Sequence, residues 1–478
     1  MSQNEEVEMD EEEDQLQNQK DQSEVHLNEF KDEDVLTRDP DYYNYKESAC
    51  SMKEGSIQGG VFALSSLALG TGAFSLPVRC AQIGCFWYSL AIIFGAIIAY
   101  WTLSKLIESS RVIKGKEYST TVKIIIGKVP SIIVDIILML YSFGVIIQFN
   151  VIIYSLIGRT IYYYFYDKKY EIYNKFEEGL WQTNYYYKCS IMFGLTFLIF
   201  PVCLLKDISK MRFASMFGIC ALSYSILVVV IETPWFFSKE ELSKANWFNI
   251  SNGFKVDDYN VLEFFNAMAT VFFIFSCHPG AFPVFKSLKY NFPKRINTVF
   301  RRSIILDLII YLLVAICGFI TNPIKPPDLI VYRNAEKVFS NDIFMNIAKI
   351  SIALDLYLSI PANYNSLRAS FFLLFFKTDT IDNCRNIIVT LPILLIGTFI
   401  GVIFNDILSY ISLLGGFCCS IICLLVPCIL MVKTSKQEIF SPRNIFRIFI
   451  LGTLCLIGFT AGILTIIGMK IKKKDNEN

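Results

Sequence analysis

Long runs of apolar residues dominate this sequence, and they restrict the folds open to it more than any other feature does. A helix needs roughly 20 mostly apolar residues to cross a bilayer. By that measure we expect eleven spans, at about 59–83, 86–108, 130–160, 188–205, 213–235, 262–285, 303–323, 345–372, 387–404, 407–432 and 446–469. Hydrocarbon offers the backbone no hydrogen-bond partners, so each span must be helical, and no alternating ten-residue segments indicate a barrel. The sequence predicts an all-α polytopic membrane protein.

The N-terminal tail is the exception to this pattern. Its first fifty residues hold 17 Asp or Glu against 4 Lys or Arg, a net charge of −13, in a chain that is only 18% charged overall. So acidic a segment is expected to be disordered. We therefore predict a disordered cytosolic tail at 1–55, a transmembrane domain at 56–470 and a short C-terminal tail at 471–478.

Charges in the loops predict the orientation of the spans, because loops rich in Lys and Arg tend to stay in the cytosol. The loops on one side of the expected spans carry 20 basic residues, and those on the other side carry 10. This bias places the N-terminus in the cytosol. On the opposite side, Asn249, Ile250 and Ser251 form a glycosylation sequon, which predicts a glycoprotein modified at Asn249.

Two of the expected spans contain residues that interrupt helices. In the first span, Gly70 and Gly72 flank Thr71, and Pro77 follows. In the sixth, prolines at positions 279 and 283 surround a glycine. Glycine loosens a helix, and proline removes an amide donor. Because unwound backbone is tolerated at membrane depth only where it lines a cavity or is buried in protein, the two breaks predict a polar site between them.

The spacing of the breaks predicts a repeated architecture. They lie five spans apart, as in a five-plus-five inverted repeat. We expect the first repeat at 59–235, the second at 262–432 and one extra helix at 446–469. The glycines could instead serve only to let helices pack closely, but that alternative leaves the prolines of the second break unexplained.

The ends of broken helices suit a zwitterion. A half-helix N-terminus presents unpaired amides and about half a positive charge, which favours a carboxylate, while freed carbonyls favour an ammonium group or a cation. An amino acid carries both groups. The first break, at Gly70, Thr71 and Gly72, is therefore one wall of the expected substrate site.

Three stretches of the sequence match a known pattern: the Gly-Thr-Gly break at 70–72 with Leu-Pro after it, the segment from Cys277 to Lys289 that begins Cys-His-Pro, and Pro-Val-Cys-Leu-Leu-Lys at 201–206. Together they resemble the amino acid/auxin permease family, especially its system A and N neutral amino acid transporters and its proton-coupled branch. The resemblance implies a LeuT-like fold with eleven spans. It also implies uptake of amino acids coupled to sodium or to protons.

Site residues follow from the resemblance by position. The backbone at Gly70 to Gly72 is expected to hold the α-carboxylate and α-amino groups of the substrate. Phe275, Ser276 and Cys277 are expected to shape the pocket from the sixth span.

A carboxyl at membrane depth is the first candidate for coupling to a cation, because an acidic residue there costs about 2.5 to 3.5 kcal/mol to insert. Asp355 lies near the middle of the eighth span, and Ser359 stands one turn later on the same face. Asp355 could bind sodium, carry a proton or serve only to pair with another helix. The remaining carboxyls of interest lie nearer span ends and are expected to reach water: Asp135, Glu232, Glu263 and Asp307.

Ser66 bears on which cation is used. Sodium-coupled members of the family have an asparagine four residues before the first glycine of the break, where this chain has Ser66, a poorer cation ligand. We therefore expect proton-coupled symport, with sodium-coupled symport as the alternative. His278 is a further candidate for proton handling because imidazole titrates near physiological pH, although it could instead only hydrogen-bond the unwound backbone.

Other classes of function fit the sequence less well. The spans contain no nucleophile and base pair for an enzyme and no filter motif for a channel. The cysteines lie within apolar runs without CxxC pairs, so neither a metal site nor another cofactor is expected. The expected partners are an amino acid and membrane lipid, with no nucleic acid. The membrane is expected to be the plasma membrane or a vacuolar or lysosomal one.

An amino acid sensor is a further alternative. In that case the acidic tail would bind a cytosolic partner while the membrane domain binds an amino acid. The tail contains three tyrosines among its acidic residues, at positions 42, 43 and 45, which could take part in such an interaction.

Overall fold

The structure is a computed structural model that describes residues 56–477, with gaps in that description at 113–116, 166–180, 205–211, 251–260, 289–292, 325, 334–341, 377–382, 405, 436–437 and 439. The predicted acidic tail lies outside the described residues. So does Ser251 of the predicted glycosylation sequon.

Regular structure in the described part of the chain is helical throughout. The helices that correspond to the expected spans are α3 (Ile57–Ala68), α4 (Leu76–Ile83), α5 (Cys85–Val112), α7 (Lys128–Phe165), α9 (Trp181–Cys203), α10 (Arg212–Glu232), α12 (Val261–Ile274), α13 (His278–Ser287), α14 (Pro293–Thr321), α15 (Ile343–Phe376), α16 (Asn383–Ile403), α17 (Ile407–Leu413), α18 (Val426–Lys433) and α19 (Pro442–Glu477). The shorter elements are the 3-10 helices η2 (Thr71–Ser75), η4 (Thr233–Phe236) and η7 (Ile330–Tyr332), the helices α6 (Tyr118–Ile125) and α11 (Lys239–Ser243), and the π-helix η8 (Leu414–Leu425).

The helices agree with the expected spans. In the described part of the chain, 9 helical segments are long and apolar enough to cross a membrane, and the bent pair Ile57–Ala68 and Thr71–Ile83 makes a tenth. A shorter apolar helix, Lys188–Cys203, coincides with the fourth expected span. The prediction of an all-α polytopic membrane protein is confirmed.

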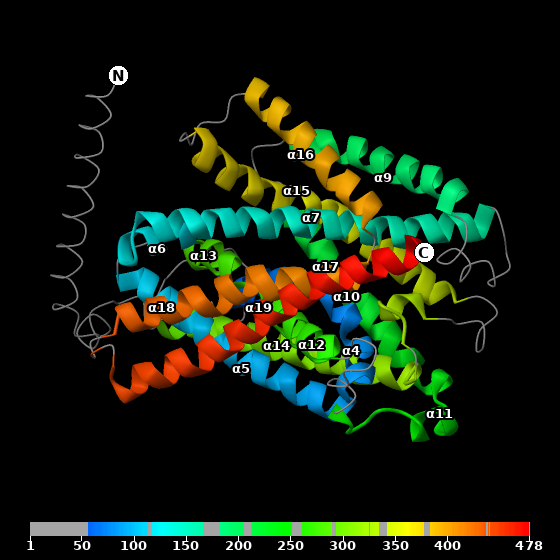
Figure 1. The fold of residues 1–478 in the computed structure, drawn as a ribbon, viewed down its shortest axis with the longest axis horizontal. Coiled ribbons are helices and arrows are strands. Elements are labelled where there is room, and N and C mark those ends of the chain that lie inside the picture. Colours follow the sequence, from blue (N-terminus) through cyan, green and yellow to red (C-terminus); the bar gives the residue numbers. More distant parts are fainter. Residues whose placement is uncertain are drawn as a thin grey trace.

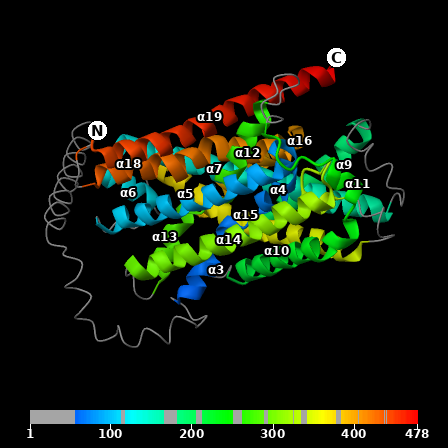
Figure 2. The same cartoon turned by 90° about the horizontal axis from the view of Figure 1, so that it is seen from below.

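The long helices run roughly parallel to one another along the horizontal axis of Figures 1 and 2. α6 lies near one end of this bundle and α11 near the other, and we name the two ends after them. Helices five spans apart in the chain pack against each other: α5 against α14, α7 against α15, and α9 against α16. This pairing agrees with a five-plus-five repeat. The last helix, α19, lies along one edge of the bundle in Figure 2 and packs on η8 and α12.

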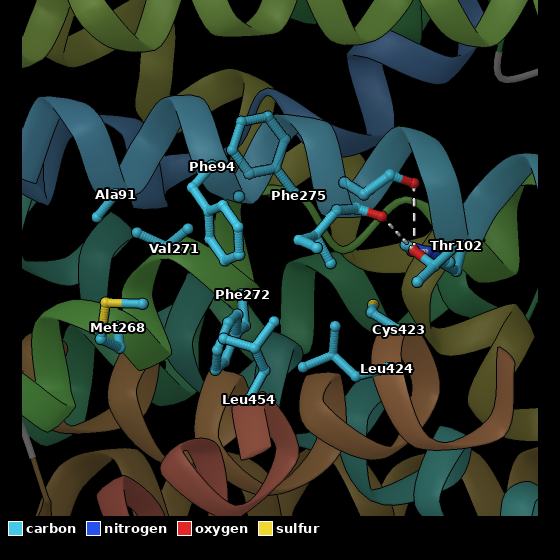
Figure 3. Close-up of a pocket in the computed structure, with 14 residues that line it drawn as sticks. Ala91, Phe94, Thr102, Met268, Val271, Phe272, Phe275, Cys423, Leu424 and Leu454 are labelled. Carbon is cyan, nitrogen blue, oxygen red and sulfur yellow. Dashed lines mark hydrogen bonds between the residues drawn. The ribbon is translucent and has the colours of Figure 1, made fainter. Parts of the chain in front are cut away.

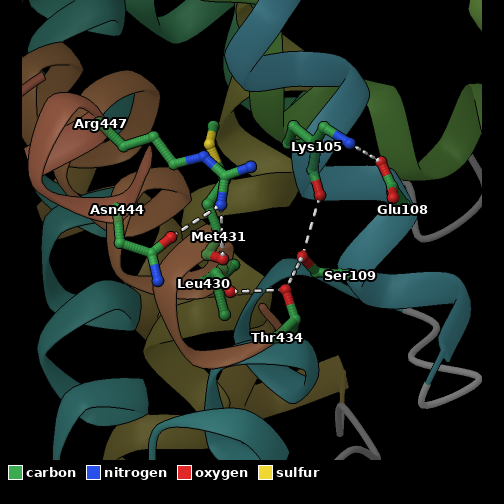
Figure 4. A network of polar contacts seen from close by, with 8 residues as sticks. All are labelled: Lys105, Glu108, Ser109, Leu430, Met431, Thr434, Asn444 and Arg447. Carbon is green, nitrogen blue, oxygen red and sulfur yellow. Dashed lines mark hydrogen bonds and ion pairs between the residues drawn. The ribbon is translucent and has the colours of Figure 1, made fainter. Parts of the chain in front are cut away.

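Polar contacts join α5, α18 and α19 at the α6 end (Figure 4). The hydroxyls of Ser109 and Thr434 lie 3.2 Å apart, and each is also within reach of a carbonyl of its own helix, so one donates to its carbonyl while the other donates between the helices. Arg447 donates to the Met431 carbonyl at 3.4 Å and to the Asn444 side chain at 3.0 Å. These bonds tie the tenth span both to the second and to the last helix.

An ion cluster joins three elements at the α11 end. Arg333, which follows η7, pairs with Glu232 at the end of α10 and lies 3.7 Å from Asp342, which precedes α15. Its guanidinium carbon also lies 4.2 Å from the centre of the Phe236 ring. Burial lowers the pKa of Arg333 to about 10, so the guanidinium stays protonated at neutral pH.

Candidate functional site

Both expected interruptions are present. α3 ends at Ala68 and the chain becomes helical again at Thr71, with a bend of 52° between the two parts. α12 ends at Ile274, and α13 begins at His278 with Pro279 in its first turn. The glycines and prolines therefore break both helices, as the sequence predicts.

The two breaks lie against each other. A Cβ atom at Gly72 would come within 2.9 Å of Ile274 and 3.0 Å of Phe273, so glycine is what lets η2 approach the end of α12. Gly70 differs, because the nearest atom to a Cβ there would be the Ala68 carbonyl oxygen, at 4.0 Å. Gly72 is thus a packing contact, whereas a methyl group at Gly70 would meet no atom closer than 4.0 Å.

Tyr311 of α14 links the two broken helices. Its hydroxyl lies 2.8 Å from the carbonyl oxygen of Ala68 and 2.7 Å from that of Ile274, the last residues of α3 and α12. The side chain is fully buried, and its ring meets that of Phe275 edge to face at 5.3 Å. Since the hydroxyl has one hydrogen, it can fully satisfy only one of the two carbonyls at a time.

The second break is held from α7 by Tyr141. The hydroxyl of Ser276 donates to the Phe273 carbonyl at 2.6 Å. Its lone pairs remain available, so the bond of 2.9 Å between Tyr141 and Ser276 runs from the tyrosine to the serine. This bond fixes the orientation of Ser276 beside the unwound backbone.

Gln148 reaches the first break from the same helix. Its side-chain amide donates to the hydroxyl of Thr71 at 3.3 Å. The side chain is fully buried, and its carbonyl oxygen has no hydrogen-bond partner among the described residues. Sequence reasoning missed Gln148 and Tyr141, although a buried amide within an apolar span is itself a signal of function.

The junction of the breaks offers donors beside acceptors. The amides of Thr71 and Gly72 begin η2, where a helix lacks intrahelical partners for its first donors and carries partial positive charge. The carbonyls of Ala68 and Ile274 compete for one hydroxyl hydrogen and so keep capacity to accept from another donor. This arrangement can hold a carboxylate and an ammonium group of one small molecule. The six predicted substrate residues all lie at this junction.

The predicted ion-coupling residues do not form one cluster. Asp355 is buried at 7% exposure, and its carboxylate faces α10, where a Cβ at Gly218 would collide with it. No hydrogen bond or ion pair to Asp355 occurs among the described residues. Ser66 turns its hydroxyl back to the Ala63 carbonyl at 2.9 Å. Ser359 is partly buried one turn along α15 from Asp355.

His278 joins α13 to α5 and is fully buried. Thr102 donates to carbonyls of its own helix, so it accepts the 2.8 Å bond from His278 Nε2 and thereby fixes the proton on that nitrogen. Nδ1 has no partner in the described part of the chain.

A cavity beside this pair has mostly apolar walls from α5, α12, η8 and α19, among them Phe94, Met268 and Leu454 (Figure 3). Of the predicted site residues, Phe275 and His278 line it. Its lining does not include Gly70, Thr71 or Gly72, so the cavity is distinct from the first break.

The expectation that the remaining carboxyls reach water was wrong for three of them. Asp307 is fully buried, and Asp135 and Glu232 are 9% and 6% exposed. Glu263 is partly buried. The helices extend beyond the apolar runs, and α14 begins at Pro293, so Asp307 stands in its middle rather than near its end.

Arg79, which sequence reasoning also missed, joins three helices toward the α11 end. Its guanidinium donates to Thr270 of α12 at 3.2 Å, to Ser412 of α17 at 3.0 Å and to Gln82 at 3.0 Å. Gln82 in turn donates to Glu263 at 3.4 Å. Arg79 is 2% exposed, and its bonds hold α4, α12 and α17 together on the side of the breaks nearer the α11 end.

Asn249 lies exposed in the loop before α12, where its backbone amide donates to Asn246 at 2.9 Å.

The cysteines within the described residues are free. In the same part of the chain, no group of three or more His, Cys, Asp or Glu side chains is placed to hold a metal ion.

Comparison with known proteins bears on the whole membrane domain. A model of the family described as "Transmembrane amino acid transporter protein" matches residues 53–471. Sodium-coupled neutral amino acid transporter 7 of Homo sapiens is 24% identical over 403 residues, which cover 81% of this chain and 82% of that protein. Sodium-coupled neutral amino acid symporter 2 of Danio rerio is 20% identical over 443 residues, covering 87% of this chain and 84% of that protein.

A solved structure resembles the fold. The crystal structure of MhsT in complex with L-phenylalanine aligns with a TM-score of 0.50 over 88% of this chain and 98% of that chain. The sequence identity is 14%, so this likeness bears on the fold alone. The fold is LeuT-like.

Proposed function

This chain belongs to the transmembrane amino acid transporter family, and from that membership we propose that it is a proton-coupled amino acid symporter that works by alternating access. It is a secondary transporter of amino acids embedded in a membrane by many helices, and it is not an enzyme. The proposal adds the driving ion, the site of the substrate and the orientation.

The junction of the two broken helices carries the proposal for the substrate site. Donors at the start of η2 stand beside carbonyls of α3 and α12 that share the Tyr311 hydroxyl. An amino acid would place its carboxylate on the amides of Thr71 and Gly72 and its ammonium group on the carbonyls. Phe275, Ser276 and Cys277 would surround it from the second break. At Gly70, a Cβ atom would meet no atom closer than 4.0 Å.

Protons are favoured as the driving ion by Ser66. Its hydroxyl bonds to the carbonyl of its own helix, so it does not offer the amide oxygen that an asparagine would present there. Asp355, with Ser359 on the same helix, stays a candidate for binding the ion, as does His278. Sodium coupling is the second candidate because both relatives named above carry "sodium-coupled" in their names.

The orientation and the sensor alternative rest on the sequence. The charge bias of the loops supports a cytosolic N-terminus, in the plasma membrane or in a vacuolar or lysosomal membrane. A sensor would signal through the tail at 1–55, which lies outside the described residues.

Uptake by purified protein in liposomes tests the proposal. Labelled amino acids are supplied outside while the proton gradient and the sodium gradient are imposed one at a time at a clamped membrane potential. We expect accumulation above the external concentration under an inward proton gradient without sodium.

Liposomes without protein are the control for leakage. Absence of uptake of every amino acid by monodisperse, folded protein would contradict the transport assignment. Uptake that depends on sodium and ignores the proton gradient would contradict proton coupling and favour the sodium alternative.

A further inference from the structure

Asp307 occupies a position on α14 that connects both broken helices. Ser303 stands one turn before it and Tyr311 one turn after it, so the three side chains share one face of the helix. The Ser303 hydroxyl bonds to that of Ser65 on α3 at 2.8 Å. Tyr311 bonds to the carbonyls at the ends of α3 and α12. Asp307 therefore lies between two contacts that hold α3 against α14.

The surroundings of Asp307 supply no positive charge. The side chain is fully buried, and among the described residues neither carboxyl oxygen has a hydrogen-bond partner of good geometry. The groups that face it are the hydroxyls of Ser65 and Ser303, the thiol of Cys277 and the phenol of Tyr311. In the described part of the chain, no Lys, Arg or His of α3, α4, α5, α10, η2 or η4 interacts with it.

A carboxylate in these surroundings is costly, because an unpaired charge moved from water into an apolar interior loses several kcal/mol of solvation even after relaxation. The packed arrangement around Asp307 is therefore compatible with a neutral carboxyl. If the carboxyl lost its proton, the resulting negative charge would need water or a cation beside it. The side chain is closed off on every side, so water could reach it only if the elements packed around it moved apart, and α3 and α14 meet beside it at Ser65 and Ser303.

Asp355 and His278 are less well placed for such a role. Asp355 faces α10 rather than the breaks. His278 bonds to Thr102 beside the apolar cavity. Asp307 thus differs from both in lying next to residues that touch the ends of α3 and α12.

We infer that Asp307 takes up and releases the proton that drives transport, and that its ionisation loosens α3 from α14. This inference rests on the proposed function. Water on one side of the membrane gives a proton to a carboxylate oxygen, forming one O–H bond. The same bond breaks when the proton passes to water on the other side, and no electrons are gained or lost.

The test compares Asp307→Asn with wild type in liposomes, using two assays on each protein. Asparagine mimics the neutral carboxyl, so the variant is expected to fold and to keep exchange of internal labelled amino acid for external unlabelled amino acid, which needs no net proton movement. Accumulation driven by a proton gradient is expected to be lost, with the ratio of internal to external amino acid falling to unity. Exchange is also expected to become independent of pH.

Asp135→Asn is the matched control, because it makes the same change at another buried carboxyl, near the α6 end, where Ser119 donates to Asp135 at 2.8 Å. It is expected to retain accumulation driven by protons. Retained accumulation in Asp307→Asn would overturn the inference, and so would wild-type accumulation driven by sodium alone. Failure of exchange in wild type itself would instead count against the proposed function, so the two failures can be told apart.

Ser65→Ala provides a second variant in case Asp307→Asn does not fold. It removes one hydroxyl beside the carboxyl and leaves the acid in place. We expect the pH at which proton-driven uptake is half maximal to shift, while uptake at saturating proton concentration stays the same. An unchanged pH profile in Ser65→Ala would overturn the inference.

Discussion

At the residue scale, the two glycines of the first break have different roles although they are two positions apart. A Cβ atom at Gly72 would press against Ile274 and Phe273, whereas the nearest atom to a Cβ at Gly70 would be the Ala68 carbonyl oxygen, 4.0 Å away. Adding one methyl group therefore tests packing at one position and access to the site at the other.

We predict that Gly72→Ala destabilises the folded protein by about 1 to 3 kcal/mol, the usual cost of forcing an extra carbon into a packed interior. The new methyl would lie 2.9 Å from Ile274 and 3.0 Å from Phe273, so η2 or α12 would have to move. Unfolding in detergent, followed by loss of helical signal with heat or denaturant, measures the change.

Gly70→Ala is the matched variant, because it adds the same methyl group two residues away. We predict near wild-type stability, since the methyl would meet no atom closer than 4.0 Å, and weakened amino acid uptake, since it would enter the proposed substrate site. Normal uptake by Gly70→Ala would show that the substrate does not lie there. Equal stability of the two variants would contradict the packing role of Gly72.

Residues that act on their own stretch of backbone could be predicted from the sequence. Residues that act on parts of the chain far from them in sequence could not. Gly70, Gly72, Pro279 and Pro283 interrupt helices by their own chemistry, whatever surrounds them. Tyr311 acts on carbonyls that lie 37 and 243 positions away in the chain, so only the folded structure shows its partners. The six predicted substrate residues followed from the first break and from the family resemblance by position.

At the element scale, hydropathy located the helices but not their ends. The apolar run of the seventh span was expected at 303–323, whereas α14 begins at Pro293 and includes several basic residues in its first turns. A helix can extend past the apolar run when long charged side chains reach water from its ends. For that reason Asp307 was misplaced near a boundary by the sequence prediction.

Arg79 gives a prediction about how helices close together. Its bonds join α4 to α12 and α17, and a hydrogen bond from a charged group contributes about 1.5 to 3 kcal/mol. Arg79→Ala is therefore expected to favour separation of these helices. We predict that the neighbouring Cys80, which is 0% exposed, reacts about ten- to a hundredfold faster with a thiol reagent that does not cross membranes.

Mass spectrometry of the labelled peptide assigns the reaction to Cys80 among the other cysteines. Lys105→Ala serves as the control, because Lys105 is exposed and pairs with Glu108 at 2.5 Å near the α6 end. It should leave the labelling of Cys80 unchanged. An Arg79→Ala protein in which Cys80 reacts no faster than in wild type would show that Arg79 does not hold this side closed.

At the scale of the whole molecule, ion pairs between helix ends and the segments that connect helices hold the α11 end together. The Arg333 cluster joins the end of α10 to the segment between α14 and α15, and so connects the two repeats. The cluster is buried, which makes it less sensitive to salt than a surface pair.

We predict that Arg333→Met destabilises the protein by about 3 to 5 kcal/mol, because Glu232 and Asp342 would be left as buried charges without a partner. Adding Glu232→Gln to that variant is expected to recover part of the loss. Denaturant unfolding of the single and double variants measures both effects.

Lys244→Met is the control for the loss of a single pair, since Lys244 and Glu240 are exposed at the same end of the bundle. Its expected cost is below about 1 kcal/mol. If Arg333→Met cost no more than Lys244→Met, the cluster would have no special part in holding the repeats together.

The bond of Tyr311 to two carbonyls also bears on the breadth of substrates. One hydroxyl hydrogen serves Ala68 and Ile274 in turn, so at any moment one of these two carbonyls can accept from another donor. An ammonium group can be that donor through its N–H bonds, and every α-amino acid with a primary amine has the same ones. If the substrate binds as proposed, this recognition does not distinguish one side chain from another, and selectivity among amino acids is expected to come from the walls of the site.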